Sequence, residues 1–185
     1  MYFLPLSWET QPHKVRKGIQ DMFIESQASY MQNYGIQDAG ACSFGVVNTQ
    51  EKLAKLTKSD LWKEWEQQFL NTTGIATLAN NWIRQETVIC SKKPLNTLAD
   101  FKGVKIRTVS SETTIASYNA LGFSATPIAF SEVFLSLQQG VVDATFGTKD
   151  NIYTNSFYVE APNILMWGPS CTNLGVWINN AKLQS

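Results

Sequence analysis

Two stretches decide the fold of this chain: PLNTLADFKGVKIR at residues 94–107 and EVFLSLQQGVVD at residues 132–143. In the first, Thr97 and Asp100 have the spacing of a helix-capping box, and a glycine then ends the turn. An alternating apolar and polar run follows and leads to Arg107, as a strand should. The second stretch predicts an amphipathic helix that is stopped by a glycine and followed by another strand. Strands that alternate with helices predict an open α/β domain, which binds ligands beyond its strand ends.

Composition predicts a globular protein and excludes several partners. The chain has 185 residues, and 44% of them are hydrophobic, which is ample for a packed core. Fifteen basic residues balance fifteen acidic ones, so no charge pattern indicates nucleic acid or an anionic membrane surface. No run approaches the ~18 apolar residues that a membrane-spanning helix needs. The first residues also lack the pattern of a signal peptide.

Cysteine and histidine usage argues against disulfide and metal chemistry. Cys42, Cys90 and Cys171 are odd in number and far apart, which does not fit a disulfide framework. With His13 as the single histidine, a zinc site is not expected either. We expect the cysteines to be buried apolar side chains, and we expect no metal and no cofactor.

Hydrophobic periodicity and turn residues predict the remaining elements. We expect helices over residues 12–31, from Ser59 to about 70, and over 112–121, and strands over 39–47, 75–78, 82–90, 125–130, 141–146 and 173–179.

Taken in order, the short motifs resemble a known family. They have the order and spacing found in the extracytoplasmic solute-binding proteins of tripartite ATP-independent periplasmic (TRAP) transporters, of the dicarboxylate- and sialic-acid-binding type. The resemblance covers roughly residues 72–180, and each motif alone is common. The motifs are Lys93-Pro94-Leu95, Asp100-Phe101-Lys102-Gly103, Lys105-Ile106-Arg107, Leu121-Gly122, Pro127, Glu132-Val133 and Gln139-Gly140-Val141-Val142-Asp143.

The resemblance implies an α/β fold of the periplasmic-binding-protein type, two-lobed and type II-like. Family members are longer, so we expect this chain to be a fragment whose fold is incomplete at both ends. Residues 1–104 are expected to form part of the N-terminal lobe. Residues 105–185 are expected to form part of the second lobe, with a hinge crossing near 143–150 and a return toward the first lobe. The implied function is capture of an organic acid between the lobes in the periplasm and delivery to a TRAP membrane permease.

The resemblance also nominates a ligand-binding residue. Arg107 matches the arginine that grips the ligand carboxylate in the family. A guanidinium presents a rigid fork of donors that matches two carboxylate oxygens, and it keeps its charge in a partly dry cleft. The alternative is an ordinary surface arginine at the end of a strand.

Departures from the family pattern bear on the choice of ligand. Gly147 stands where many members carry an asparagine that points into the cleft, so that polar contact is either lost or supplied by Thr145 or Thr148. Without a second arginine contact, the site would suit a monocarboxylate, a keto or hydroxy acid, or a larger ligand stacked on aromatic side chains. Phe146 and Trp167, with Tyr153, are the candidate stacking groups, although each is also a good core residue.

A second family arginine lies shortly before the Lys-Pro motif. This chain has Glu86 at that place and Arg84 two residues earlier. On a strand the two side chains would share a face and could pair with each other. The other interpretation makes Arg84 a secondary carboxylate contact.

The sequence gives little support to an enzyme. His13 is the one available histidine base, and no Gly-x-Ser-x-Gly or phosphate-binding glycine motif occurs. Glu132 and Asp143 could form a carboxylate pair, but Glu132 is better explained by its place in the first turn of a helix. We therefore expect no catalytic residues. A ligand-sensing domain of the same fold is the first alternative, and a small α/β hydrolase-type enzyme is a weaker one.

Overall fold

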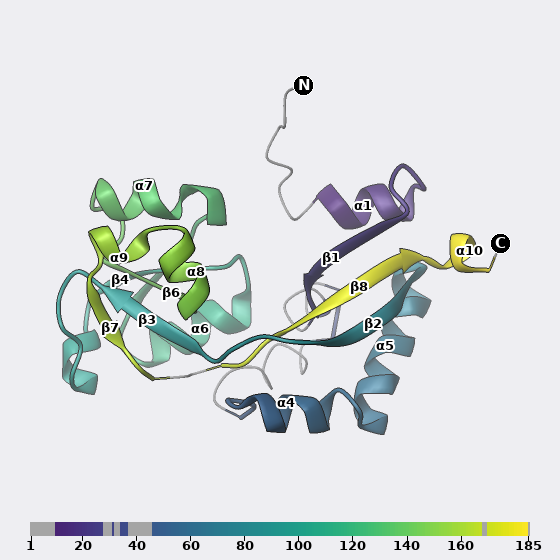
Figure 1. Cartoon of the computed structure of the whole chain (residues 1–185), viewed down its shortest axis with the longest axis horizontal. Helices are drawn as coiled ribbons and strands as arrows, with labels where there is room; N and C mark the ends of the chain where they lie inside the picture. Colours follow the sequence, from purple (N-terminus) through teal and green to yellow (C-terminus); the bar gives the residue numbers. More distant parts are fainter. Residues whose placement is uncertain (1–9, 28–30, 32–33, 37–45, 168–169, 185) are drawn as a thin grey trace.

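The computed structural model describes residues 10–27, 31, 34–36, 46–167 and 170–184, which form two lobes joined by two chain crossings (Figure 1). Each lobe is built on its own sheet, with strand order β1-β8-β2 in one and β5-β4-β6-β3-β7 in the other. Helices pack against both sheets, so the expected two-lobed α/β fold is confirmed. We call the lobes the three-stranded lobe and the five-stranded lobe.

The elements divide between the lobes as follows. The three-stranded lobe holds α1 (Thr10–Arg16), β1 (Met22–Ser26), α4 (Gln50–Leu56), α5 (Asp60–Thr73), β2 (Ile75–Ile83), β8 (Asn173–Asn179) and α10 (Asn180–Leu183). The five-stranded lobe holds β3 (Thr87–Ser91), η1 (Leu98–Phe101), β4 (Lys105–Thr108), α6 (Glu112–Ala120), β5 (Ser124–Pro127), η2 (Phe130–Glu132), α7 (Val133–Gln138), β6 (Ala144–Thr148), α8 (Lys149–Thr154), α9 (Phe157–Glu160) and β7 (Asn163–Leu165).

The pairing of strands places one crossing at residues 84–86, between β2 and β3, and the other between β7 and β8. The expected division at 104/105 falls between η1 and β4, inside the five-stranded lobe. Residues 143–150, where we expected a crossing, contain β6 and the start of α8. Strand β6 pairs with both β3 and β4, so it belongs to the five-stranded sheet. We propose residues 87–165 as one lobe and the remaining described residues as the other.

The five-stranded sheet is buried on both faces. One face packs against α6 and contains Ile106 and Ala144, which are register partners on β4 and β6. The other face packs against α7, α8 and α9. The expected capping box forms at η1, where the amides of Asn96 and Thr97 donate to Asp100 and hold the pKa of its carboxyl below the ordinary value.

The core of the three-stranded lobe is aromatic. The side chain of Ser59 accepts a hydrogen bond from the Trp62 amide and caps α5, as expected from the sequence. Helix α5 then places its apolar side on the sheet, where the ring of Phe69 lies 4.7 Å from that of Trp177. The chain turns from α5 into β2 at Gly74, whose φ of 70° favours glycine.

Several expected elements have different bounds. The helix expected over 12–31 ends at Arg16, and Met22–Ser26 form β1, because Phe23 pairs with Trp177 of β8. The strand expected over 75–78 is longer, because β2 runs through to Ile83 with two register shifts. The strand expected over 82–90 begins later, because β3 starts at Thr87. Strand β6 starts at Ala144, and β5 ends at Pro127. Most of the strand expected over 39–47 lies outside the described residues.

Cys90 and Cys171 are buried and free, as expected, and Cys42 lies outside the described residues. No group of three or more His, Cys, Asp or Glu side chains in the described part could hold a metal ion. None of the described helices is long and apolar enough to cross a membrane.

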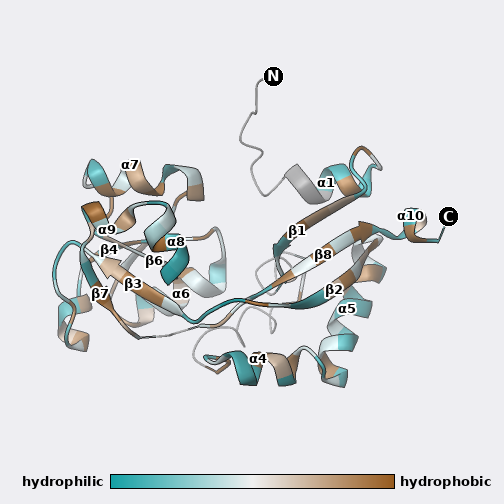
Figure 2. Cartoon of the chain, viewed as in Figure 1, coloured by the Kyte–Doolittle hydropathy of each residue, from teal (hydrophilic) through white to brown (hydrophobic). Residues whose placement is uncertain are grey.

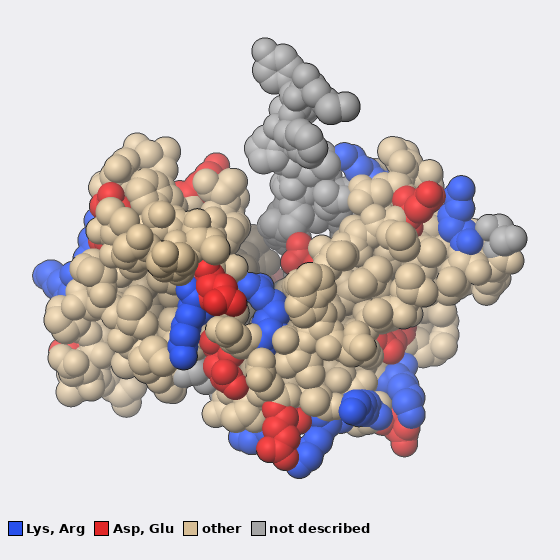
Figure 3. All heavy atoms as spheres, viewed as in Figure 1, with Lys and Arg blue, Asp and Glu red and all other residues tan. Residues whose placement is uncertain are grey.

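The side of the three-stranded sheet away from Trp177 is apolar and open. Ile24 of β1 is 53% exposed and Trp82 of β2 is 60% exposed, and their register partners on β8 are Val176 and Leu174. Figure 2 shows hydrophobic residues along these strands, and Figure 3 shows a broad uncharged area over them. Contiguous exposed apolar surface of this kind promotes association.

We expect the substitution Trp82→Arg to reduce self-association of the chain, because it places a charge in the open apolar face. Light scattering across a concentration series is the measurement. Leu98→Arg, at an exposed position of η1 in the other lobe, is the matched control and should leave association unchanged. Equal effects of the two substitutions would contradict a specific role for this face.

Candidate functional site

Arg107 lies on β4, between two parallel neighbours. Its register partners are Thr126 of β5 and Thr145 of β6. Register partners on adjacent strands point to the same side of a sheet, so the three side chains form one row. The row lies on the side opposite Ile106, close to the carboxyl ends of the parallel strands. Ligands of open α/β sheets bind at such strand ends.

The guanidinium of Arg107 is buried, and no described residue supplies a counter-charge. The residue is 5% exposed, and its Nε donates to the carbonyl of Ile128 over 2.8 Å. Among the described residues it makes no ion pair and no second hydrogen bond. Burial lowers the pKa of Arg107 to about 10, so it stays charged at neutral pH.

A buried and unpaired cation is unfavourable for the fold and is a mark of a functional site. The remaining N–H groups of the guanidinium fork match the two oxygens of a carboxylate. The site can therefore hold an organic anion.

Thr145 adds a second unsatisfied group beside Arg107. It is fully buried, and its hydroxyl has no hydrogen-bond partner in the described part of the chain. Buried hydroxyls normally find a partner, so an unsatisfied one needs an explanation.

Phe130 completes the surroundings of Arg107, and sequence reasoning did not nominate it. The Cζ atom of Arg107 lies 5.7 Å from the centre of the Phe130 ring. This ring packs edge-on against Phe157 and is still 44% exposed, so it is both anchored and accessible. An aromatic residue just after the end of β5 was the available signal, because such positions face the ligand side of the sheet.

Two of the three expected stacking groups pack against the core of the five-stranded lobe. Phe146 stacks on Tyr118 with ring centres 5.1 Å apart, and Trp167 stacks on Phe101 at 6.1 Å. Both pack in the apolar cluster on the α6 side, away from the row of Arg107. Tyr153 lies on α8, where it stacks on another exposed ring.

Arg84 and Thr148 form a separate contact. The Nη2 of Arg84 donates to the Thr148 hydroxyl over 3.2 Å, and Thr148 also caps α8. Side chains alternate along a strand, so Thr148 and Thr145 lie on opposite sides of β6. No ion pair joins Arg84 to Glu86 within the described ranges. The structure therefore groups Arg107 with Thr145 and holds Arg84 elsewhere.

Gly147 of β6 packs close to the start of α8. A Cβ atom added there would lie 3.6 Å from the Cβ of Asn151, which is an ordinary contact. Gly147 shares the side of β6 that carries Thr145, because the two are two residues apart. The place of the asparagine in the family pattern thus lies on the side of the Arg107 row, in contact with α8.

Among the described residues, no cluster of acid–base or nucleophilic groups gathers at the site. Asp143 accepts a hydrogen bond from the Lys105 amide at the opposite ends of β4 and β6. Cys90, the register partner of Thr145, has its pKa raised to about 12 by burial, so the thiol is neutral. Asp143 thus connects β4 to the start of β6, and Cys90 packs in the apolar cluster of the lobe.

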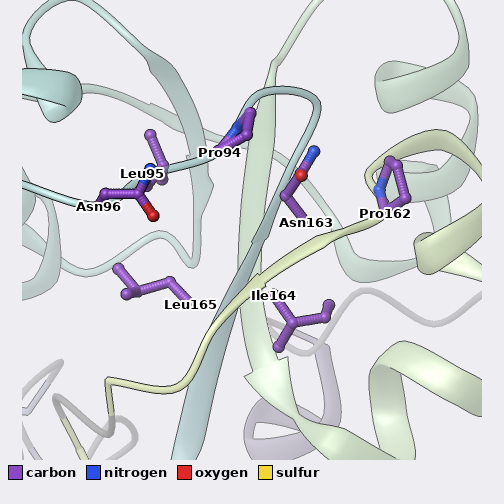
Figure 4. A pocket seen from close by; sticks show the side chains of 7 residues that line it. All are labelled: Pro94, Leu95, Asn96, Pro162, Asn163, Ile164 and Leu165. Carbon is purple, nitrogen blue, oxygen red and sulfur yellow. The ribbon is translucent and has the colours of Figure 1, made fainter.

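A surface pocket of about 340 Å³ lies on another part of the lobe (Figure 4). It is formed by residues 94–96 and 162–165, which include the edge strand β7. Three strand spacings separate β7 from β4, which is roughly 14 Å. The pocket is therefore not part of the Arg107 site.

Comparison with known proteins gives the family. The sequence profile of the family described as DctP, bacterial extracellular solute-binding protein, family 7, matches residues 7–185. The chain is 30% identical over 116 residues to the sialic acid-binding periplasmic protein SiaP of Vibrio cholerae, covering 63% of this chain and 36% of that protein. It is 38% identical over 104 residues to the C4-dicarboxylate-binding periplasmic protein DctP of Rhodobacter capsulatus, covering 56% and 31%.

Solved structures share the fold. A TRAP periplasmic solute-binding protein of Pseudomonas aeruginosa with bound L-malate has a TM-score of 0.89 at 20% identity, over 98% of this chain and 62% of that one. A second from Pseudomonas putida, with bound D-glucuronate, has a TM-score of 0.87 at 20% identity, over 97% and 58%. The chain thus spans about a third of the length of these two curated relatives and about three fifths of these two solved structures. The matched profile shows that the chain belongs to the bacterial extracellular solute-binding proteins of family 7.

Proposed function

We propose that this chain is the part of a periplasmic solute-binding protein that captures a small organic acid by its carboxylate. The observation that carries the proposal is Arg107, a charged side chain that is 5% exposed and has no counter-charge among the described residues. A carboxylate would neutralise it and would accept from the free N–H groups of its fork. Thr145 and Phe130 stand beside it as a hydroxyl and an aromatic surface.

The ligands of related proteins support an acid. The two curated relatives are named for sialic acid and C4-dicarboxylates, and the two solved neighbours hold L-malate and D-glucuronate. All four ligands carry a carboxylate, which is the group that Arg107 is suited to bind. Delivery of the captured acid to a TRAP membrane permease is the transport role that fits this family. The family is one of solute-binding proteins, and we propose a binding role without catalysis.

The proposal is tested by calorimetric titration of the chain with small organic acids, each paired with its closest neutral counterpart. D-glucuronate and D-glucose form such a pair. Binding of the acid, with none of the neutral sugar, is the expected result for any acid that fits. The chain spans only part of its solved relatives, and a ligand cleft needs both walls, so we expect weak binding that calls for high protein concentrations.

Acid binding is expected to be lost at high pH. The pKa of Arg107 is lowered to about 10, so its charge persists as the pH rises from about 7 to about 9 and disappears above about 10. Affinity for a carboxylate should be constant between about pH 7 and about pH 9 and should fall by up to ~tenfold per pH unit above about pH 10. The measurement is the dissociation constant across the series, with circular dichroism at each pH as a check on folding. A decline centred near neutral pH would point to a different group.

A further inference from the structure

The two crossings between the lobes run antiparallel and are hydrogen-bonded to each other. The Arg84 amide donates to the Thr172 carbonyl over 2.8 Å, and the Thr87 amide donates to the Ser170 carbonyl over 3.0 Å. The hydroxyl of Thr87 also bonds to Ser170, at 3.1 Å from its carbonyl oxygen and 3.0 Å from its hydroxyl. Any change in the angle between the lobes must bend this pair of strands.

Helix α4 and the residues before it contact both crossings. On the first crossing, Gln50 donates from its Nε2 to the Arg84 carbonyl over 3.2 Å and from its amide to Glu86 Oε1 over 3.4 Å. On the second, the Cys171 amide donates to the Val47 carbonyl over 3.1 Å. One short segment of the three-stranded lobe therefore holds both connecting strands.

A small apolar cluster supports these hydrogen bonds. Val47, Leu53 and Cys171 are all buried and pack together. The thiol of Cys171 donates to the Arg84 carbonyl over 3.2 Å, and burial raises its pKa to about 11, so it stays protonated as a donor. The cluster ties α4 to the second crossing by packing, and the thiol ties the second crossing to the first.

The far side of the first crossing is attached to the five-stranded lobe. Arg84 reaches Thr148 at the start of α8, as described above. Its backbone is held by the α4 segment, while its side chain is held by the opposite lobe. Arg84 therefore connects the α4 segment, which contacts both crossings, to the five-stranded lobe.

We propose that residues 47–56 form a hinge clasp, which holds the paired crossings and sets how far the two lobes separate. Motion of the five-stranded lobe then takes place at residues 84–87 and 170–172, with Thr87 and Ser170 as the pivot. Hinges of this kind are a few residues at the ends of elements that absorb the change in backbone angles. The clasp acts on the connection between the lobes and does not depend on which ligand binds at Arg107.

Hydrogen exchange of the whole chain tests the clasp. The substitution Leu53→Ala removes packing from the cluster and should speed exchange of the Arg84, Thr87 and Cys171 amides by about five- to tenfold relative to β4 and β6. Leu137→Ala is the matched control, because Leu137 is equally buried but lies in the five-stranded lobe. It should speed exchange around α7 and leave the crossings as they are.

A surface variant covers the case in which Leu53→Ala does not fold. Gln50 is exposed, and Gln50→Ala removes its side-chain bond to the Arg84 carbonyl, so exchange at residues 84–87 should rise by about two- to fivefold. Gln67→Ala, on the exposed side of α5, is its control. The clasp is overturned if Gln50→Ala leaves the crossings unchanged, or if Leu53→Ala speeds exchange evenly along the chain.

Discussion

Replacement of Arg107 by methionine is expected to abolish acid binding while it stabilises the fold. Methionine is similar in length, and it can fill the space beside Phe130 without a charge. The loss of a charge-assisted bidentate contact costs on the order of 3 kcal/mol of binding free energy, which is a factor of more than 100. Removal of the buried unpaired cation should raise the free energy of unfolding by about 1–2 kcal/mol.

The two effects are measured on the same protein preparations. Calorimetric titration gives the affinity, and urea unfolding followed by circular dichroism gives the stability. Arg16→Met is the matched control, because Arg16 is exposed on α1 in the other lobe and should change neither quantity. A variant at Arg107 that loses stability and keeps its affinity would mean that the arginine serves the fold and not the ligand.

The substitution Trp177→Ala is expected to have the largest effect on stability. Trp177 is fully buried in β8, and its ring lies 4.7 Å from that of Phe69 and 6.0 Å from that of Phe23. It therefore joins α5, β1 and β8 in a single core. Truncation of a buried aromatic side chain typically costs about 3–5 kcal/mol, which is a large share of the stability of a small lobe.

Chemical unfolding measures this cost, and Trp82→Ala is the control. Trp82 is the same residue type on the open side of the neighbouring strand β2, where it is 60% exposed. We expect its truncation to change the free energy of unfolding by less than about 1 kcal/mol. Similar losses for the two tryptophans would show that the core of the three-stranded lobe is not centred on Trp177.

Local signals in the sequence predicted the elements whose structure is set locally. The capping box at Thr97 and Asp100 forms, and Ser59 caps α5 with its aromatic side inward. The expectation of a strand that contains Arg107 is also confirmed by β4. In each case the decisive contacts lie within a few residues, so the pattern and the structure depend on the same neighbours.

Elements decided by distant partners were not predictable in the same way. Met22–Ser26 has helical spacing of its apolar residues, and it becomes a strand because β8, about 150 residues later, pairs with it. Phe146 and Trp167 could have served as ligand surface or core, and only the packing on Tyr118 and Phe101 places them against the core. Phe130 was missed because its closeness to Arg107 arises from the parallel pairing of β4 and β5.

The most direct test of the account follows the side chain of Arg107 by NMR. The chain contains three arginines, Arg16, Arg84 and Arg107, so their Nε–H signals can be assigned by single substitutions. On titration with a bound acid such as D-glucuronate, the Arg107 signal should shift with saturation while the Arg16 signal stays in place, and D-glucose should shift neither. An acid that binds without moving the Arg107 signal, or a neutral sugar that moves it equally, would contradict carboxylate capture at this arginine.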